Sequence, residues 1–159
     1  MRLSTFTDYS LRLLLYLAAA PERRATIGEV AGAYRISENH LVKVAHLLGR
    51  HGVLRNTRGR RGGISLARPA AEINIGKVVR LTEHGDGPID CLEGACRTCR
   101  VAPACRLPRI LGAAMRAFYA VLESYSLADV VRAPEILALT ASGSGPMTSK
   151  RWGRFSRSA

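Results

Sequence analysis

The sequence lacks any run of the roughly 18 to 20 uncharged apolar residues that a membrane-spanning helix requires. Its first residues, which include Arg2 and Asp8, also lack the basic-then-apolar pattern of a secretory signal. We therefore expect a soluble, cytoplasmic protein that has no membrane partner. The 159 residues allow one compact core and leave too little chain for several.

Acidic residues are scarce: 12 Asp and Glu stand against 24 Lys and Arg, which gives a net charge of +12. Such a surplus favours a polyanionic partner, and nucleic acid is the first candidate. A basic, Ser- and Gly-rich end, residues 136–159, has too few apolar side chains to order and is predicted to be a disordered tail. The stretch from Asn39 to Ala71 has no acidic residue and seven basic ones, namely Lys43, Arg50, Arg55, Arg58, Arg60, Arg61 and Arg68.

Three helices are predicted before residue 51. Thr7 and Asp8 cap the first, which ends before Pro21. Thr26 and Glu29 fit a capping box at the start of the second, and Ser37 caps the third after a turn. The apolar spacing places these side chains inward: Leu11, Leu14, Leu15 and Ala18 in the first helix, Ile27, Val30 and Ala31 in the second, and Leu41, Val44, Ala45 and Leu48 in the third.

The second and third helices have the order of a helix-turn-helix. The third helix then presents Asn39, His40, Lys43 and His46 along the outer side of its N-terminal part, from which side chains reach base edges. For the two histidines the alternative is an ordinary surface or packed position on a helix. We expect Ser37, Asn39, His40 and Lys43 to contact DNA.

A two-stranded hairpin is predicted after Gly52, where apolar residues flank a turn rich in Gly and Arg. Such a hairpin is the wing of a winged helix, which predicts a mainly α fold with a small β-hairpin over residues 1–80. The alternative is a solvated hairpin whose arginines only keep the protein in solution. The preceding helix-turn-helix favours DNA contact through the tip residues, namely Arg58, Arg60, Arg61, Gly62 and Gly63.

All four cysteines fall in one predicted loop, residues 81–106. Their spacing leaves three interpretations open: an iron–sulfur cluster, a structural zinc site, or redox-active thiols. Zinc sites use paired short spacings, whereas a cluster tolerates wider and irregular ones, and this loop has one short pair. Neighbouring arginines would offset the anionic charge of a thiolate-bound cluster. The cysteines are Cys91, Cys96, Cys99 and Cys105.

A long helix is predicted to follow Cys105 within residues 107–135. Packing inside one chain is one use for its broad apolar stripe, but a small winged helix leaves little to cover it. We therefore expect a homodimer that presents two reading helices to an inverted-repeat operator. The stripe consists of Leu111, Phe118 and Tyr125, seven residues apart, joined by Ala114, Met115, Val121 and Leu122.

Several segments, in order from Met1 to about Pro134, resemble the bacterial winged-helix iron–sulfur transcriptional regulators of the NsrR/IscR-type family, and most closely its nitric-oxide-sensitive members. The segments are MRLSTFTDYSLRLLLYLA at the start, SENHLVKV in the third helix, RGRRGGISLARP in the wing, INIGKVVRLTE before the cysteine loop, CRVAPACRL at its end, and SYSLADVV after the long helix.

The resemblance implies a set of cluster ligands. Three cysteines hold the cluster in this family, which maps onto Cys91, Cys99 and Cys105, while Cys96 is a spare or alternative ligand. IscR-type members have a histidine where this chain has Pro108. The nitric-oxide-sensitive members carry an aspartate that completes a 4Fe-4S cluster from the partner subunit, and the matching residue is Asp8; a 2Fe-2S cluster is the alternative. From the residues alone, Asp8 caps the first helix and pairs with Arg12.

The function that the resemblance implies is a homodimeric repressor that releases its operator when nitric oxide attacks the cluster, with target genes in nitric oxide detoxification. An iron-responsive repressor of the RirA type, which has the same wide first cysteine spacing, is the nearest alternative. A zinc-stabilised DNA-binding protein without a sensory role is another. No enzyme is expected, because the CxxC of Cys96 and Cys99 lacks a surrounding βαβ pattern.

Overall fold

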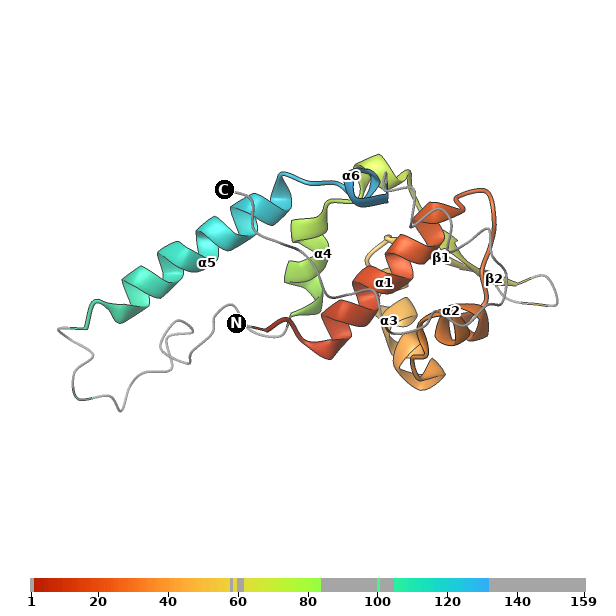
Figure 1. Cartoon of the computed structure of the whole chain (residues 1–159), viewed down its shortest axis with the longest axis horizontal. Coiled ribbons are helices and arrows are strands. Elements are labelled where there is room, and N and C mark those ends of the chain that lie inside the picture. Colours follow the sequence, from red (N-terminus) through yellow and green to blue (C-terminus); the bar gives the residue numbers. More distant parts are fainter. Residues whose placement is uncertain (1, 58, 60–61, 84–99, 101–104, 132–159) are drawn as a thin grey trace, which may run out of the picture.

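The computed structural model describes residues 2–57, 59, 62–83, 100 and 105–131. Within these residues, three α-helices, a hairpin, a short 3-10 helix and three further α-helices follow one another (Figure 1). None of the described helices is long and apolar enough to cross a membrane. The elements are α1 (Thr5–Ala19), α2 (Ile27–Tyr34), α3 (Glu38–Arg50), β1 (Leu54–Thr57), β2 (Gly63–Leu66), the 3-10 helix η1 (Ala70–Glu72), α4 (Ile75–Thr82), α5 (Leu107–Glu123) and α6 (Leu127–Val131).

The N-cap of helix α1 lies three residues before Thr7, the earlier of the two caps that the sequence predicts. The Ser4 hydroxyl oxygen accepts a hydrogen bond from the backbone N–H of Thr7 at 3.1 Å, so Ser4 is the N-cap and the predicted capping by Thr7 and Asp8 is wrong. The helix ends before Pro21, as predicted. The predicted inward stripe is confirmed, because Leu14 and Ala18 are buried and Leu11 and Leu15 pack, partly buried, against the same core. The buried residues of α1 are Thr7, Ser10, Leu13, Leu14, Leu17 and Ala18.

The α2–α3 unit confirms the predicted helix-turn-helix. Thr26 and Glu29 form the capping box, with the Glu29 side chain accepting from the Thr26 N–H at 2.6 Å. Arg35 ends α2 in the left-handed conformation at φ 54°, and the Ile36 N–H then donates to the Ala31 carbonyl at 3.0 Å. This bonding turns the chain sharply and buries Ile36. Helix α3 packs Leu41, Val44, Ala45 and Leu48 inward, as predicted.

The hairpin also forms as predicted, with Leu54 opposite Leu66 and Thr57 opposite Gly63 in an antiparallel pair. Ala25 adds a short third edge, because its N–H and carbonyl both bond to Ile64, at 3.0 and 2.8 Å. A Cβ on Gly63 would stand 2.9 Å from the Ala25 carbonyl oxygen, so this close approach requires glycine. The base of the wing is thereby fixed to the segment before α2.

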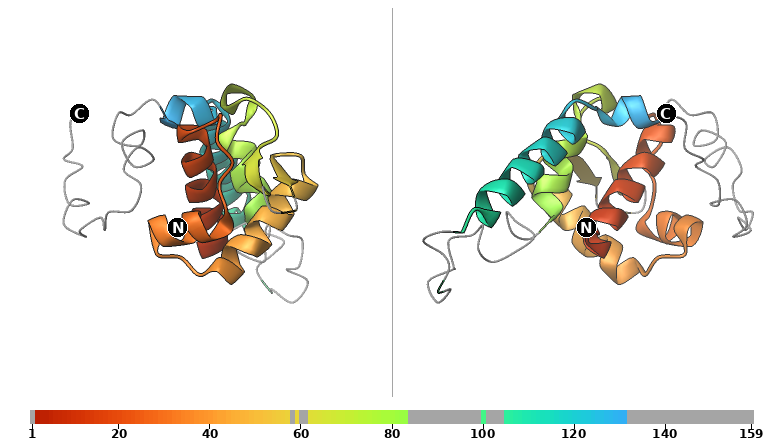
Figure 2. Two further views of the ribbon diagram at one scale, coloured as in Figure 1. Left: turned by 90° about the vertical axis from the view of Figure 1, so that its right-hand side faces the viewer. Right: turned by 60° about the vertical axis from the view of Figure 1, so that its left-hand side comes forward.

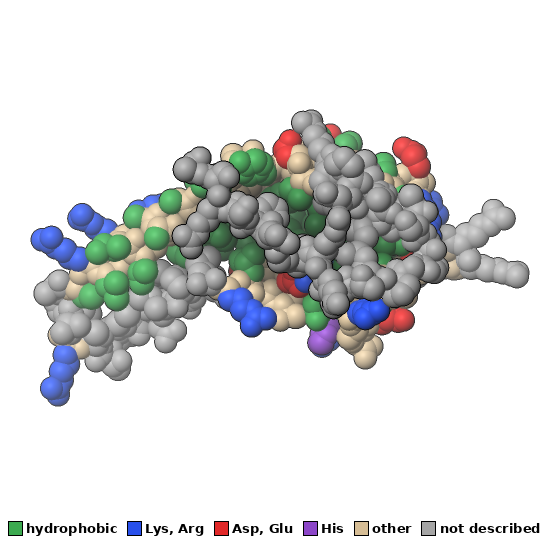
Figure 3. All heavy atoms as spheres, in the orientation of Figure 1, with side chains coloured by type: hydrophobic (Ala, Val, Ile, Leu, Met, Phe, Trp, Pro, Cys, Tyr) green, Lys and Arg blue, Asp and Glu red, His purple; other side chains and the backbone are tan. Residues whose placement is uncertain are grey.

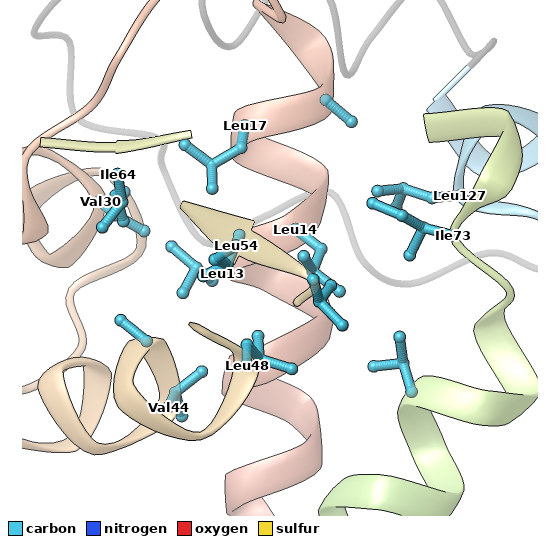
Figure 4. Close-up of a cluster of buried hydrophobic side chains, with 14 of the residues drawn as sticks. Leu13, Leu14, Leu17, Val30, Val44, Leu48, Leu54, Ile64, Ile73 and Leu127 are labelled. Atoms are coloured by element: carbon cyan, nitrogen blue, oxygen red, sulfur yellow. The ribbon is translucent and has the colours of Figure 1, made fainter. Parts of the chain in front are cut away.

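The core joins the winged helix to the later helices. Figure 4 shows Leu13, Leu14 and Leu17 of α1 among side chains from α2, α3 and the hairpin, with Ile73 and Leu127 on the side of α4 and α6. Helix α6 packs on α1, and its residues Leu127 and Val131 belong to this core. The right-hand view in Figure 2 shows α5 leaving this body as an extended arm.

The C-terminal end of α5 is held tightly against α4. The Arg80 guanidinium stacks 3.8 Å from the centroid of the Tyr119 ring and pairs with Glu123 at 2.9 Å. Asn74 donates from its side-chain amide to the Glu123 carbonyl at 2.6 Å. A Cβ on Gly76 would lie 2.7 Å from the Glu123 backbone nitrogen, so α4 and α5 touch backbone to backbone there. Tyr119 is the one buried residue of α5.

Candidate nucleic-acid interface and metal-ligating residues

The outer side of α3 carries the predicted base-reading residues. Asn39, His40, Lys43 and His46 are all exposed, and they lie away from the buried stripe of the same helix. Ser37 is exposed and occupies the predicted N-cap position of α3, but its hydroxyl makes no capping hydrogen bond. The Ser37 carbonyl instead accepts from the backbone N–H groups of the first turn. The Ser37 hydroxyl is therefore available to an external partner.

His40 has a neighbour that the sequence did not reveal. Its imidazole ring lies 5.9 Å from the ring of Tyr9, with the two planes tilted by 44°. Tyr9 belongs to α1, two helices earlier in the chain, and it is half-buried. No sequence signal links the two residues, because their contact depends on how α1 crosses α3. The ring contact restricts where His40 points.

The wing lies after the recognition helix, and part of its tip is described. Gly62 donates its N–H to the Gly59 carbonyl at 2.8 Å, which closes the turn. Arg58, Arg60 and Arg61 fall outside the described residues. Lys43, Arg50, Arg55 and Arg68 are exposed, and none of them forms an ion pair within the part of the chain that the structure describes. Along α3 and the hairpin, these side chains therefore add positive charge that no ion pair offsets within the described residues.

Of the candidate metal ligands, two are described. Cys105 is a free, exposed thiol immediately before α5, with Arg106 and Arg109 exposed beside it in sequence. Cys91, Cys96 and Cys99 lie outside the described residues. Within residues 2–57, 62–83 and 105–131, no three His, Cys, Asp or Glu side chains gather around one point. A free cysteine sulfur next to arginines fits a thiolate-bound iron–sulfur cluster, whose negative charge those arginines would offset.

Asp8 makes the predicted pair with Arg12, at 3.0 Å between carboxylate oxygen and Nε, and both side chains are half-exposed. Arg12 in turn lies over the ring of Tyr34, 5.9 Å from its centroid. Tyr34 is the last residue of α2, and burial raises the pKa of its phenol above 10.0, with Arg12 acting in the opposite direction. The phenol is neutral at physiological pH. Asp8 is thus connected through one arginine to the end of α2.

The start of α1 is also tied to the point where the cysteine loop begins. The Thr7 hydroxyl bonds to the Thr82 hydroxyl at 2.8 Å, in the buried interior, and the Ser4 N–H donates to Glu83 at 2.8 Å. Thr82 ends α4, and the cysteine-bearing segment follows directly. Sequence reasoning missed these bonds because each joins residues more than seventy positions apart. They place the first turn of α1 beside the beginning of that segment.

Helix α5 separates its apolar side chains into two faces. Met115, Phe118 and Leu122 pack against the chain's own core. Leu107, Ile110 and Val121 stay 50%, 61% and 60% exposed, and Figure 3 shows apolar side chains along this arm with basic ones near its free end. Part of the predicted stripe therefore packs inside the chain, while Val121 and Tyr125 of the same stripe stay exposed. The exposed face runs through Leu107, Ile110, Ala114, Ala117 and Val121, all exposed at the alternating three- and four-residue spacing of a helix–helix seam.

Comparisons with known proteins agree with this arrangement. The sequence profile of the Rrf2 family, described as an iron-dependent transcriptional regulator, matches residues 3–133. The HTH-type transcriptional regulator NsrR of Shouchella clausii is 48% identical over 132 residues, which cover 82% of this chain and 89% of that relative. The protein of the same name from Bacillus subtilis is 43% identical over 136 residues, covering 85% and 93%.

Solved structures show the same fold. The oxidized form of CymR from Staphylococcus aureus superposes with a TM-score of 0.65 at 26% identity, covering 84% of this chain and 98% of that one. IscR from T. potens gives a TM-score of 0.64 at 22% identity, covering 83% and 87%, which is a likeness of fold alone. The predicted winged helix with a long following helix is therefore confirmed.

Proposed function

The chain belongs to the Rrf2 family of transcriptional regulators and is a DNA-binding repressor of that family, and we propose that it acts as a homodimer that senses nitric oxide. The observation that carries the proposal is the exposed outer face of α3, flanked by unpaired cations, in a chain similar to NsrR over most of its length. The relatives' name supports nitric oxide as the signal and detoxification genes as the targets.

DNA binding divides between two elements. Ser37, Asn39, His40 and Lys43 of α3 face the major groove, where side chains at the start of a recognition helix reach base edges. The wing, with Arg58, Arg60, Arg61, Gly62 and Gly63, contacts phosphates or the minor groove beside it. Phosphate contacts set position and affinity, whereas contacts from α3 set sequence preference.

The dimer forms through α5. Its exposed apolar face has no cover within the described chain, and pairing it with a second copy around a two-fold axis buries it. Two recognition helices then meet an inverted-repeat operator, with half-sites about 34–36 Å apart or a multiple of that spacing. A dimer also explains the shape in Figure 1, where α5 stands away from its own winged helix.

The cysteine loop holds an iron–sulfur cluster, with Cys91, Cys99 and Cys105 as ligands and Cys96 as a spare. Cys105 precedes Tyr119 by fourteen residues, which at 1.5 Å per helical residue places it roughly 20 Å along α5 from the point where Tyr119 contacts Arg80 of α4. This distance favours a fourth ligand from the other chain, namely Asp8 of the partner subunit, and hence a 4Fe-4S cluster. When bound, the cluster supplies iron that reacts with nitric oxide.

Asp8 carries the signal to the DNA-binding face. With Asp8 engaged across the dimer, Arg12 no longer pairs with the Asp8 carboxylate and stays beside Tyr34 at the end of α2. When that tether is broken, Asp8 returns to Arg12 in the arrangement that the structure shows. The two states differ next to the helix-turn-helix and beside Tyr9, which touches His40. This exchange couples the ligand site to the recognition helix.

A second candidate function has the same fold and a different signal. The Rrf2 family is described as iron-dependent, and that description favours a repressor that loses its cluster, and its DNA, when iron is scarce. A third candidate, zinc-stabilised DNA binding without a signal, predicts zinc and no acid-labile sulfide.

The test starts from protein purified without air. Iron and sulfide are counted per chain, and DNA affinity is measured for the loaded protein before and after nitric oxide or an iron chelator is added. We expect iron and sulfide in equal amounts and loss of DNA affinity with nitric oxide. Loss of DNA affinity with the chelator alone supports the iron-responsive function, and protein that holds only zinc contradicts both the nitric-oxide-sensing and the iron-responsive functions.

Cys105→Ser is expected to lose iron, whereas Cys96→Ser is expected to keep it.

A further inference from the structure

The recognition helix exposes one large apolar side chain. Val42 has 53% of its surface accessible, whereas Val44 two residues later is fully buried. Val42 lies in the middle of a stripe spaced i, i+3, i+4 and i+7, and the other three members, all exposed, are Asn39, Lys43 and His46. This stripe lies opposite the buried one, so the position of Val42 does not come from packing in the core.

The surroundings of Val42 argue against a protein partner. The other large exposed apolar side chains of the described chain lie on or after α5, and none lies on α3. Val42 is therefore an apolar surface one side chain wide, among amide, ammonium and imidazole groups, and too small for a protein to dock on. Its neighbours instead suit the edges of bases.

The major groove offers one apolar group to such a side chain. Its edges present hydrogen-bond donors and acceptors, except for the 5-methyl group of thymine. On the basis of the DNA-binding function proposed above, we propose that Val42 reads a thymine: its γ-methyl groups pack against that 5-methyl in each half of the operator. Asn39, about one helical turn away, and Lys43, the next residue, form hydrogen bonds with the edges of adjacent base pairs.

The position of Val42 in α3 fits this role. It lies in the first half of the helix, the part that reaches base edges in a helix-turn-helix. His40 lies on the flank of α3 that contacts Tyr9 of α1, whereas Val42 lies between Asn39 and His46, clear of that contact. Val42 is thus free to enter the groove without displacing a neighbouring helix.

Replacing thymine by deoxyuridine tests the proposal, because the two bases differ only in the 5-methyl group. The operator is first enriched from a random duplex library by the full-length protein carrying its cluster. Each thymine of the enriched duplex is then replaced in turn, and affinity is measured by fluorescence anisotropy. We expect replacement at one position in each half-site to lower the binding affinity roughly fourfold, and replacement at both positions to lower it about fifteenfold. These factors correspond to the burial of one methyl group in each half-site.

Variants assign the effect to Val42. Val42→Ala is expected to bind the thymine and deoxyuridine duplexes with equal affinity, near that of the wild type for the latter. Val130→Ala removes the same methyl groups from an exposed valine of α6 and is expected to keep the wild-type discrimination. Thermal melting checks that both variants are folded.

Two results would overturn the inference and leave DNA binding intact. One is a wild-type protein that binds every deoxyuridine duplex as tightly as the thymine duplex. The other is a Val42→Ala variant that still discriminates at the same positions. A wild-type protein that enriches no sequence at all would contradict the repressor function and the inference together.

Discussion

Asp8 pairs with the Arg12 side chain of the same helix, and we propose that it can instead ligate the cluster across the dimer. The pair with Arg12 is half-exposed and spaced i, i+4, so it contributes only about 0.3–0.5 kcal/mol to stability. A weak pair is suited to a switch, because exchanging it costs little. Two roles are therefore to be separated for Asp8: ligation of the cluster, and stabilisation of its own helix through the pair with Arg12.

Asp8→Ala separates these roles. We expect a changed visible absorption spectrum and faster loss of iron, with a melting temperature close to that of the wild type because the pair it removes is weak. Arg12→Gln is the matched control: it breaks the same pair, keeps the carboxylate, and is expected to keep the spectrum. An Asp8→Ala spectrum identical to the wild type, with the same response to nitric oxide, would remove Asp8 from the ligand set.

Among the elements, we propose that the wing sets the affinity for DNA and that α3 sets the sequence preference. Replacing Arg60 and Arg61 with alanine is expected to weaken binding to all sequences. It should also make the dependence of log affinity on log salt shallower by about 0.9 for each phosphate that the wing no longer neutralises. Lys77→Ala with Arg116→Ala removes two exposed charges elsewhere and controls for net charge. A slope that stays unchanged in the wing variant would contradict phosphate binding at the tip.

The junction of α4 with α5 depends on Gly76. Gly76→Ala places a methyl group 2.4 Å from Glu123 Cγ and 2.7 Å from its backbone nitrogen, so α5 must shift. We expect a loss of about 1–3 kcal/mol in unfolding free energy, measured by denaturant titration. Gly32→Ala in α2 has no atom within 4 Å of its new Cβ and is expected to stabilise by up to about 1 kcal/mol. Equal effects of the two substitutions would contradict the close contact.

Local signals predicted most of the elements. The capping box of Thr26 and Glu29, the inner stripe of α3 and the Gly- and Arg-rich turn are each contained in a few adjacent residues. The start of α1 was harder to predict, because Ser4, Thr5, Thr7 and Asp8 are all capable N-caps, and only the structure shows that the Ser4 hydroxyl reaches Thr7. Contacts between distant segments, such as Thr7 with Thr82, leave no local pattern.

The candidate site was predictable in part for the same reason. Helical periodicity identified the outer residues of α3, but it assigns no role to an exposed valine, and Val42 was missed. The stripe on α5 was recognised as broad, yet periodicity does not tell which of its side chains the chain's own α4 covers. The structure assigns Met115 and Phe118 to the core and leaves Val121 exposed.

At the scale of the whole molecule, the proposed function requires a dimer. Ile110→Glu puts a charge on the exposed face of α5, where it leaves the fold of one chain intact and cannot be buried at a two-fold seam. We expect a monomer by analytical ultracentrifugation, with weaker operator binding. Ala120→Glu, on the same helix outside this face, is expected to stay dimeric. A dimeric Ile110→Glu protein would show that α5 does not form the interface through this face.

Release of DNA by nitric oxide is tested by following the cluster and the operator in one sample. Protein loaded without air is mixed with its fluorescent operator, and nitric oxide is added in steps while visible absorption and anisotropy are recorded together. We predict that both signals change at the same dose, a few nitric oxide molecules per cluster. Bleaching of the absorption while the operator stays bound would contradict nitric oxide sensing through the cluster, as would operator release before any bleaching.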